Sequence, residues 1–431
     1  MWHEIPHSAG FGTIWFVSNA QTRLTLEPHG SSRNTLGLVR IALVAVAFAS
    51  SGTSVALAQT VTVPMIVEGN APIIEVQVRN GEHVRTARFL IDTGGGAVQI
   101  GSKLMADLSA VPSGPGSNEG GDRIVPLQGL AFNVDGFGLD LKGVNVIGLP
   151  DSVRTMARNA TEGTLSASVL RKYRVVFDYP GHTFTITAAG GKPRGEKIPT
   201  TIATVSGYPR IEATIGGKRY GFLLDTGASF SMLSRTVLEE WSAQNPLWPI
   251  AIGAAGFANM VGNDADKGPM LRISKVKIGS FSLADVAMVS RAPGVYETVM
   301  SEMMSAPIAG AIAGNVLRDF RVEIDYRNEA TYFERKLHAT DEDLVSVGLI
   351  LGLANNGDPV VTALCSTAGE DVKHGVQLRD RPVAVDGKIV NGEPLAVIAR
   401  LLSGTAGTSR RLTLRRAGLQ LDVDVRTKKL L

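Results

Sequence analysis

Short alternating runs of apolar and polar residues dominate the chain from about residue 60 onward. The run at residues 71–78, APIIEVQV, ends at Asn80-Gly81, and the run at 210–215, RIEATI, ends at Gly216-Gly217. Asn-Gly or Gly-Gly between two β-rich runs is a strong signal for a hairpin. Since few stretches show the 3.6-residue period of a helix, the pattern predicts a mainly β fold.

These runs belong to a unit that occurs twice. FLIDTG at residues 89–94 returns as FLLDTG at 222–227, and VLRKYRVVFDYP at 169–180 returns as VLRDFRVEIDYR at 316–327. The same order of elements at nearly the same spacing indicates a duplication. We therefore predict two tandem all-β lobes, at residues 59–189 and 198–336, with GGKPRGEK at 190–197 as the exposed connector.

The C-terminal segment, residues 343–431, has a different pattern. A short β-like start is followed by a polar loop, a strand–turn–strand around VAVDGKIV at 383–390, and an apolar helical stretch at 394–402. Two alternating strands, RRLTLRRAGLQLDVDV, follow. This order predicts a small α+β domain after the two β lobes.

The N-terminal region is typical of an export signal. Arg33 precedes an apolar stretch at 36–50, and Ala56-Leu57-Ala58 is a small-x-small cleavage site before Gln59. The uninterrupted apolar part is shorter than the roughly 20 residues that span a bilayer. We interpret residues 1–58 as a leader that is removed, leaving an exported, periplasmic or secreted protein without a stable membrane span.

Charge and cysteine content exclude several functional classes. The 431 residues carry 43 basic and 40 acidic side chains, a net charge of +3, which gives no electrostatic case for nucleic acid. The single cysteine, Cys365, excludes an intramolecular disulfide and a zinc site built on several thiolates. An HExxH string at residues 3–7 contains a proline that breaks the helix this motif requires. We therefore expect no metal and no cofactor.

The repeated Asp-Thr-Gly carries the candidate chemistry. Asp92 and Asp225 each follow an apolar strand, so two symmetry-related loops that face each other would bring both carboxyl groups together. Such a pair shares one proton and supplies a base to activate water and an acid to protonate a leaving amide. Thr93 and Thr226 would lock the loops by hydrogen bonds, while Gly94 and Gly227 permit the turn.

These motifs resemble the retropepsin-like aspartic proteases, specifically bacterial exported members with two units in one chain, over residues 61–334. The resemblance implies one catalytic aspartate per unit, a hairpin flap over the substrate, and a hydrophobic-hydrophobic-Gly motif that supports each active-site loop. Ile312-Ala313-Gly314 fits this motif, whereas the first unit has Leu165-Ser166-Ala167. We expect the alanine to crowd the first loop and leave that half-site less tightly organised.

By their order in the chain, residues 117–121 and 256–262 are the flap candidates, and Phe257 is the candidate apolar contact with substrate. Two ordinary surface loops are the alternative interpretation.

Residues 343–427 resemble a PDZ domain. In that family a glycine-containing loop before a strand binds a peptide's C-terminal carboxylate, and the peptide adds to the sheet as a strand. Gly348, Leu349 and Ile350 occupy the matching position. A PDZ fold that only packs against the protease is the alternative.

The leading hypothesis is an aspartic-type endopeptidase, a monomer that cleaves peptides or unfolded proteins and carries a PDZ-like peptide-binding module. A non-catalytic peptide-binding or scaffold protein on a protease fold is one alternative. Another is an enzyme that processes only its own leader. The sequence has no Gly-x-Ser-x-Gly nucleophile motif, which excludes one common class of serine hydrolase.

Overall fold

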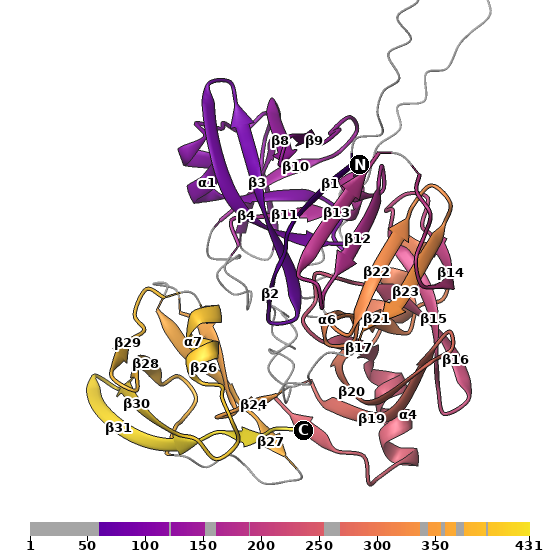
Figure 1. Ribbon diagram of the computed structural model, residues 1–431. Coiled ribbons are helices and arrows are strands. Elements are labelled where there is room, and N and C mark those ends of the chain that lie inside the picture. Colours follow the sequence, from indigo (N-terminus) through magenta and orange to yellow (C-terminus); the bar gives the residue numbers. More distant parts are fainter. Residues whose placement is uncertain are drawn as a thin grey trace, which may run out of the picture.

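The computed structural model describes residues 60–119, 122–150, 161–188, 190–253, 268–336, 344–354, 358–367, 375–393 and 395–431. The predicted leader and the candidate flap at 256–262, with Phe257, lie outside the described residues. The chain is mainly β, as its alternating pattern predicts (Figure 1). We call residues 60–188 the first lobe, 190–336 the second lobe and 344–431 the C-terminal unit.

The first lobe contains a sheet of ten described strands. Its strands are β2 (Ile66–Glu68), β3 (Ala71–Asn80), β4 (His83–Asp92), β5 (Val98–Gly101), β6 (Ser117–Glu119), β7 (Asp122–Leu127), β8 (Leu130–Val134), β9 (Phe137–Gly138), β10 (Val146–Leu149) and β11 (Gly163–Ser166). Two short helices, α1 (Ser102–Asp107) and α3 (Ala167–Leu170), follow β5 and β11. The predicted hairpin is β3–β4, with its turn at Gly81, whose φ of 54° suits glycine.

The second lobe repeats this order. Its strands are β15 (Pro209–Ile215), β16 (Lys218–Leu224), β17 (Ser231–Ser234), β18 (Ile250–Ile252), β19 (Met270–Ile278), β20 (Phe281–Arg291) and β21 (Gly310–Ile312). Its helices are α4 (Arg235–Gln244), the π-helix η2 (Val295–Met300), α5 (Ser301–Met304) and α6 (Gly314–Leu317). In each lobe the strand before Asp-Thr-Gly lies parallel to the strand before the supporting motif, β4 beside β11 and β16 beside β21.

Six strands join the lobes in the order β1-β13-β12-β22-β23-β14. They are β1 (Thr60–Pro64), β13 (Thr183–Thr187), β12 (Arg174–Asp178), β22 (Phe320–Asp325), β23 (Ala330–Arg335) and β14 (Glu196–Ile202). The last of these begins inside the predicted connector. The repeated sequence blocks therefore form the junction, because β12 and β22 pair antiparallel with Val176 opposite Glu323.

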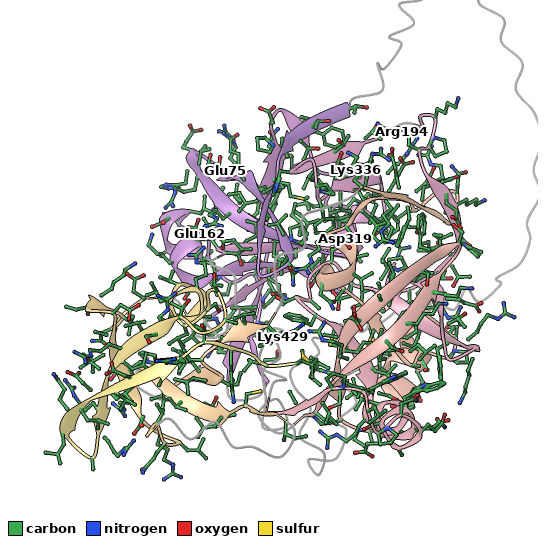
Figure 2. All side chains as sticks on the ribbon, turned by 60° about the horizontal axis from the view of Figure 1, so that its bottom comes forward. Glu75, Glu162, Arg194, Asp319, Lys336 and Lys429 are labelled. Atoms are coloured by element: carbon green, nitrogen blue, oxygen red, sulfur yellow. The ribbon has the colours of Figure 1, made fainter. Side chains whose placement is uncertain are left out.

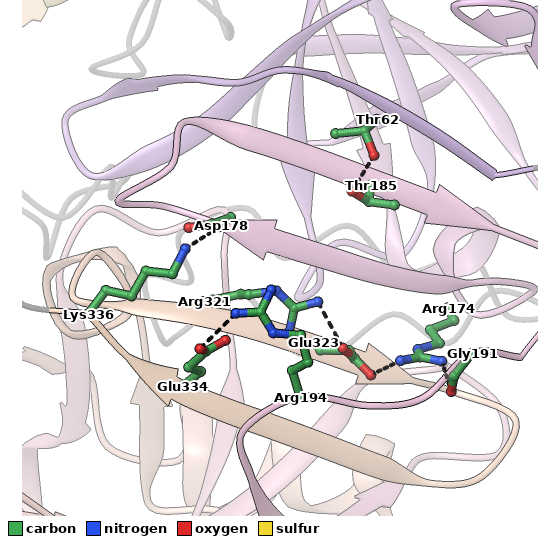
Figure 3. Close-up of polar contacts among 10 residues, drawn as sticks. All are labelled: Thr62, Arg174, Asp178, Thr185, Gly191, Arg194, Arg321, Glu323, Glu334 and Lys336. Atoms are coloured by element: carbon green, nitrogen blue, oxygen red, sulfur yellow. Dashed lines mark hydrogen bonds and ion pairs between the residues drawn. The ribbon is translucent and has the colours of Figure 1, made fainter.

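Charged side chains cluster on this junction (Figure 3). Arg174 and Arg321, at equivalent places in the two repeats, both contact Glu323, which is fully buried. Lys336 Nζ lies 2.5 Å from Asp178 Oδ2 of the first lobe, and its backbone N–H donates to the Asp319 carbonyl at 3.0 Å (Figures 2 and 3). The junction thus combines backbone pairing with a buried ion cluster.

The C-terminal unit has its own apolar core, which includes Val347, Val385, Ile398 and Leu412. Its elements are β24 (Val345–Ser346), β25 (Leu349–Leu353), β26 (Pro359–Leu364), β27 (Ser366–Thr367), β28 (Arg381–Val385), β29 (Lys388–Ile389), α7 (Leu395–Leu401), β30 (Ser409–Arg416), β31 (Leu419–Arg426) and β32 (Lys428–Lys429). The strand–turn–strand, the helix and the closing pair of strands follow the predicted order.

This unit contacts both lobes. β27 pairs with β18 of the second lobe, and Arg400 Nη1 of α7 lies 3.1 Å from Glu68 Oε1 of the first. Lys429 of β32 lies between the C-terminal unit and the lobes (Figure 2). The next residues, Leu430 and Leu431, are buried in an apolar cluster shared with the second lobe. The C-terminal unit is therefore anchored to the body of the molecule.

Candidate active site

The two predicted aspartates emerge from equivalent strand ends. Asp92 is the last residue of β4, and Asp225 directly follows β16. The Gly94 amide donates to Asp92 Oδ1 at 2.8 Å, and the Gly227 and Ala228 amides donate to Asp225 Oδ1 at 2.9 and 3.1 Å. These bonds hold each carboxyl group inside its own turn, where it is half-buried.

The glycines of the two loops bring the carboxyl groups together. A methyl group added to Gly94 would lie 3.0 Å from Cγ of Asp225, and one added to Gly227 would overlap the carboxyl group of Asp92. Each loop therefore lies directly against the aspartate of the other lobe. Any larger residue at either glycine would push the opposite carboxyl group away.

Thr93 and Thr226 fasten the two loops reciprocally. Thr93 Oγ1 donates to the Leu224 carbonyl at 2.5 Å and accepts from the Thr226 amide at 3.0 Å. Thr226 Oγ1 donates to the Ile91 carbonyl at 2.7 Å and accepts from the Thr93 amide at 3.1 Å. Both threonines are fully buried, so these four bonds compete with no solvent.

The environment disfavours charge on both carboxyl groups. Burial and then the neighbouring Asp225 charge raise the pKa of Asp92 from its ordinary 3.8 to about 7. Burial raises the pKa of Asp225 to about 6, opposed by the Ala228 and Gly227 amides and the Arg291 guanidinium. Two carboxyl groups this close cannot both ionise easily. Both carboxyl groups therefore favour their protonated form over a wider pH range than an exposed aspartate does.

The turn between β2 and β3 of the first lobe supports the second loop. Asn70 Nδ2 donates to the Ser229 carbonyl at 3.2 Å, and the Asn70 carbonyl occupies the space that a Cβ on Gly314 would need. The Gly314 amide in turn donates to the Ala228 carbonyl at 3.0 Å. Glycine is required at 314 because the chain of the other lobe touches it.

The first lobe makes the equivalent support with alanine. The Ala167 amide donates to the Gly95 carbonyl at 3.1 Å, and Ala167 is fully buried. The second-lobe turn on this side differs from the Asn70 turn that touches Gly314. It contains Gly207, at φ 77°, and its Val205 carbonyl accepts a hydrogen bond from Arg171 Nη1 at 2.9 Å. The first loop therefore keeps its supporting hydrogen bond with alanine at this position.

Electrostatic effects link this pair to further side chains that were not singled out from the sequence. The aspartate charges contribute to the raised pKa of Tyr208, and the Asp225 charge contributes to that of Tyr296, although burial is the main cause for both. Arg291 lowers the pKa of Asp225. The strand register gives Arg291 and Leu149 equivalent positions in the two lobes, but neither lies in a recognisable motif.

The remaining predicted residues occupy other regions. β6 and β7 form the hairpin expected around residues 117–121. Gly348 has φ 77°, and Leu349 and Ile350 begin β25 in the C-terminal unit. Within the described ranges, no group of three or more His, Cys, Asp or Glu residues is placed to hold a metal ion. Likewise, no helix in this part of the chain is long and apolar enough to cross a membrane.

Comparison with protein families points to the second of these two loops. Residues 211–301 match a family model described as aspartyl protease. The match supports an aspartyl protease domain. It runs from β15 through η2 and contains Asp225, Thr226 and Gly227 of the second lobe. A search of curated proteins found no match to the chain.

Proposed function

We propose that this chain is an aspartic-type endopeptidase in which Asp92 and Asp225 activate water between the two lobes. The observation that carries the proposal is the reciprocal fastening of the two Asp-Thr-Gly loops, which holds each aspartate against the glycine of the other lobe. Peptides and unfolded proteins are the proposed substrates, because an extended chain fits a site between two β lobes. The proposed reaction requires only the residues of this chain and water.

The raised pKa values of the pair suit the proposed roles. One carboxyl group carries the proton and donates a hydrogen bond to the scissile carbonyl oxygen. The other is ionised and accepts a proton from the attacking water, whose oxygen forms the new bond to carbon. The tetrahedral intermediate then collapses as a proton passes to the leaving nitrogen. The C–N bond breaks, giving a carboxylic acid and an amine.

The same pKa values predict the pH range of activity. One proton remains on the pair between about pH 6 and pH 7, the values to which Asp225 and Asp92 are raised. The profile of kcat/KM against pH should therefore be bell-shaped with its maximum in this interval. We expect little hydrolysis at pH 3, where both groups are protonated.

Digestion of a fluorescently labelled unfolded protein at pH 6.5 tests the proposal. Asp92→Asn and Asp225→Asn should each reduce hydrolysis by at least about a thousandfold, because either change removes one of two groups that act as a unit. Asp135→Asn is the matched control, since Asp135 is an exposed turn residue of the first lobe. Hydrolysis by both active-site variants at the rate of the control would refute the assignment.

The C-terminal unit is the proposed peptide-binding module. β25 pairs with β26 on one edge, the described strands supply no partner on its other edge, and α7 contacts β25. A free strand edge beside a helix suits an added peptide strand. Fluorescence anisotropy should therefore show binding of a peptide with a free apolar C-terminus and none of its C-terminal amide. Equal binding of both peptides would contradict a carboxylate-binding loop at Gly348, Leu349 and Ile350.

A further inference from the structure

In both lobes, the strand that follows the Asp-Thr-Gly loop pairs with a second, parallel strand. We call this pair of strands the wall of that lobe. β5 and β17 each begin six residues after the aspartate, and each lies parallel to a second strand, β10 or β20. In this register Gly101 pairs with Leu149, and Ser234 pairs with Arg291. Leu149 and Arg291 are therefore equivalent positions at the ends of the two walls.

Strand alternation sets the face to which each of these residues belongs. Leu149 shares a face with Ile147, and both belong to an apolar cluster with Ala97, five residues after Asp92. Arg291 shares a face with Val289. Val289 belongs to the apolar cluster that contains Phe230, five residues after Asp225. The two walls thus match in position but differ in chemistry, with leucine on one side and arginine on the other.

Arg291 acts electrostatically on Asp225 without forming an ion pair in the described part of the chain. Arg291 is half-buried, and its guanidinium lowers the pKa of both Asp225 and Tyr296. Among the residues that the structure describes, no aspartate or glutamate forms an ion pair with Arg291, whereas Arg210 and Arg321 both have acidic partners. A half-buried cation beside an apolar wall is a good site for an anionic group of a ligand.

We propose that Arg291 determines specificity by binding an acidic side chain of the substrate on the second-lobe side of the paired aspartates. This inference rests on the proposed endopeptidase function and adds the substrate class. The equivalent position on the first-lobe side is Leu149, which is buried in an apolar cluster and offers no charge to a substrate. The preferred substrate is therefore asymmetric, with an aspartate or glutamate on one side of the scissile bond and no matching acidic preference on the other.

The protonation states are compatible with this binding. A glutamate in a peptide has an ordinary pKa of about 4.3, so it is ionised at pH 6.5. The catalytic pair retains one proton at the same pH. A guanidinium can bind a carboxylate through two parallel hydrogen bonds, which glutamine cannot reproduce. Discrimination between glutamate and glutamine should therefore be about 10- to 100-fold.

The test compares peptide pairs that differ only by glutamate or glutamine at one position, scanned across four residues on each side of the cleaved bond. At pH 6.5 the wild-type chain should show a kcat/KM ratio of at least about 10 in favour of glutamate at one position. Arg291→Leu should bring this ratio to about 1, and Arg291→Lys should retain part of it. Arg219→Leu, at an exposed arginine of the same lobe, should leave the ratio unchanged.

Because the ratio is taken within one enzyme, it cancels the effect of Arg291 on the pKa of Asp225. A shifted pH profile in Arg291→Leu with an unchanged glutamate preference would overturn the proposal, since Arg291 would then act only on Asp225. A wild-type ratio near 1 at every position would overturn it as well.

A binding measurement separates this proposal from the proposed function. Calorimetry with the same peptide pairs, carrying a reduced bond that cannot be hydrolysed, reports the glutamate preference without catalysis. If the chain cleaves nothing but binds the glutamate peptide more tightly, and Arg291→Leu removes that difference, the endopeptidase proposal fails and the Arg291 site stands. Equal binding of both peptides would reject the site.

Discussion

The two half-sites hold their Asp-Thr-Gly loops with the same threonine hydrogen bonds, but the side-chain contacts that support each loop differ. Thr93 and Thr226 make the same two hydrogen bonds in mirrored order, and the resulting loops are equivalent. Behind the second loop, Asn315 Oδ1 accepts from the Ser231 amide at 2.7 Å and from Ser231 Oγ at 2.8 Å. Behind the first, Ser168 makes a single 2.7 Å bond with Ser166.

This difference indicates which contacts each copy must keep. The loops face a common centre, so a change in one disturbs both carboxyl groups. The residues that support each loop contact only their own lobe and one turn of the opposite lobe, so they can differ between the two copies. The same division applies to the junction, where Glu323 of one repeat lies opposite Val176 of the other.

The largest effect is expected at this junction. Glu323→Ala leaves buried Arg174 and half-buried Arg321 without their shared acid, which should cost about 3–5 kcal/mol of the free energy of unfolding. The equivalent change in the first repeat, Val176→Ala, should cost roughly 1–2 kcal/mol. Urea unfolding followed by tryptophan fluorescence measures both.

A triple variant provides the control for that measurement. Replacing Arg174, Glu323 and Arg321 together by methionine, leucine and methionine should recover most of the loss, because no buried charge remains unpaired. If Glu323→Ala and Val176→Ala unfold at the same urea concentration, the buried ion cluster does not stabilise the junction.

The supports behind the loops should give an intermediate effect. Gly314→Ala forces a methyl group against the Asn70 carbonyl, so the free energy of unfolding should fall by roughly 1–3 kcal/mol and activity should drop. Ala167→Gly only removes a methyl group at the start of α3, at a cost of about 0.5–1 kcal/mol. Thermal unfolding and kcat/KM of both variants would show whether the supports differ; equal losses would show that they do not.

The smallest effect concerns pH. A carboxyl group whose pKa is raised on folding stabilises the protein most below its ordinary pKa, and this stabilisation is lost as pH rises through the raised value. Above about pH 7, Asp92→Asn should therefore unfold at a higher temperature than wild type, because it removes a charge that burial disfavours. Asp225→Asn should change in the same direction for the same reason.

Thermal unfolding of both variants between pH 3 and pH 8 checks this expectation. Near pH 3 the wild-type carboxyl groups are protonated in both folded and unfolded chains, so the three melting temperatures should converge. A variant that is less stable than wild type at pH 8 would show that ionised Asp92 is favoured by the fold.

Sequence reasoning predicted the parts of this molecule that short-range pattern determines. Alternation and the Asn-Gly and Gly-Gly pairs predicted the hairpins before both Asp-Thr-Gly loops, and the repeat placed Asp92 and Asp225 at equivalent strand ends. The mutual hydrogen bonds of Thr93 and Thr226 were expected for the same reason. The PDZ likeness, the leader and the flap role of Phe257 stay predictions.

The contacts that sequence reasoning missed join residues far apart in the chain. The effect of Ala167 depends on the turn around Gly207, and the need for glycine at 314 depends on Asn70 of the other lobe. Arg291 became a candidate only when the strand register gave it a position equivalent to that of Leu149 in the other lobe. In each case the sequence shows the local motif, but it does not show which residue of the other lobe contacts or corresponds to it.

The glutamate at the centre of the junction also determines which lobes can associate. Val176 and Glu323 form the central cross-strand pair, so two copies of the second repeat would place two glutamates face to face. Two copies of the first would place two valines there and leave Arg174 without Glu323, the acid that it contacts. Halves produced as separate polypeptides should therefore recombine as heterodimers in preference to pairs of like halves.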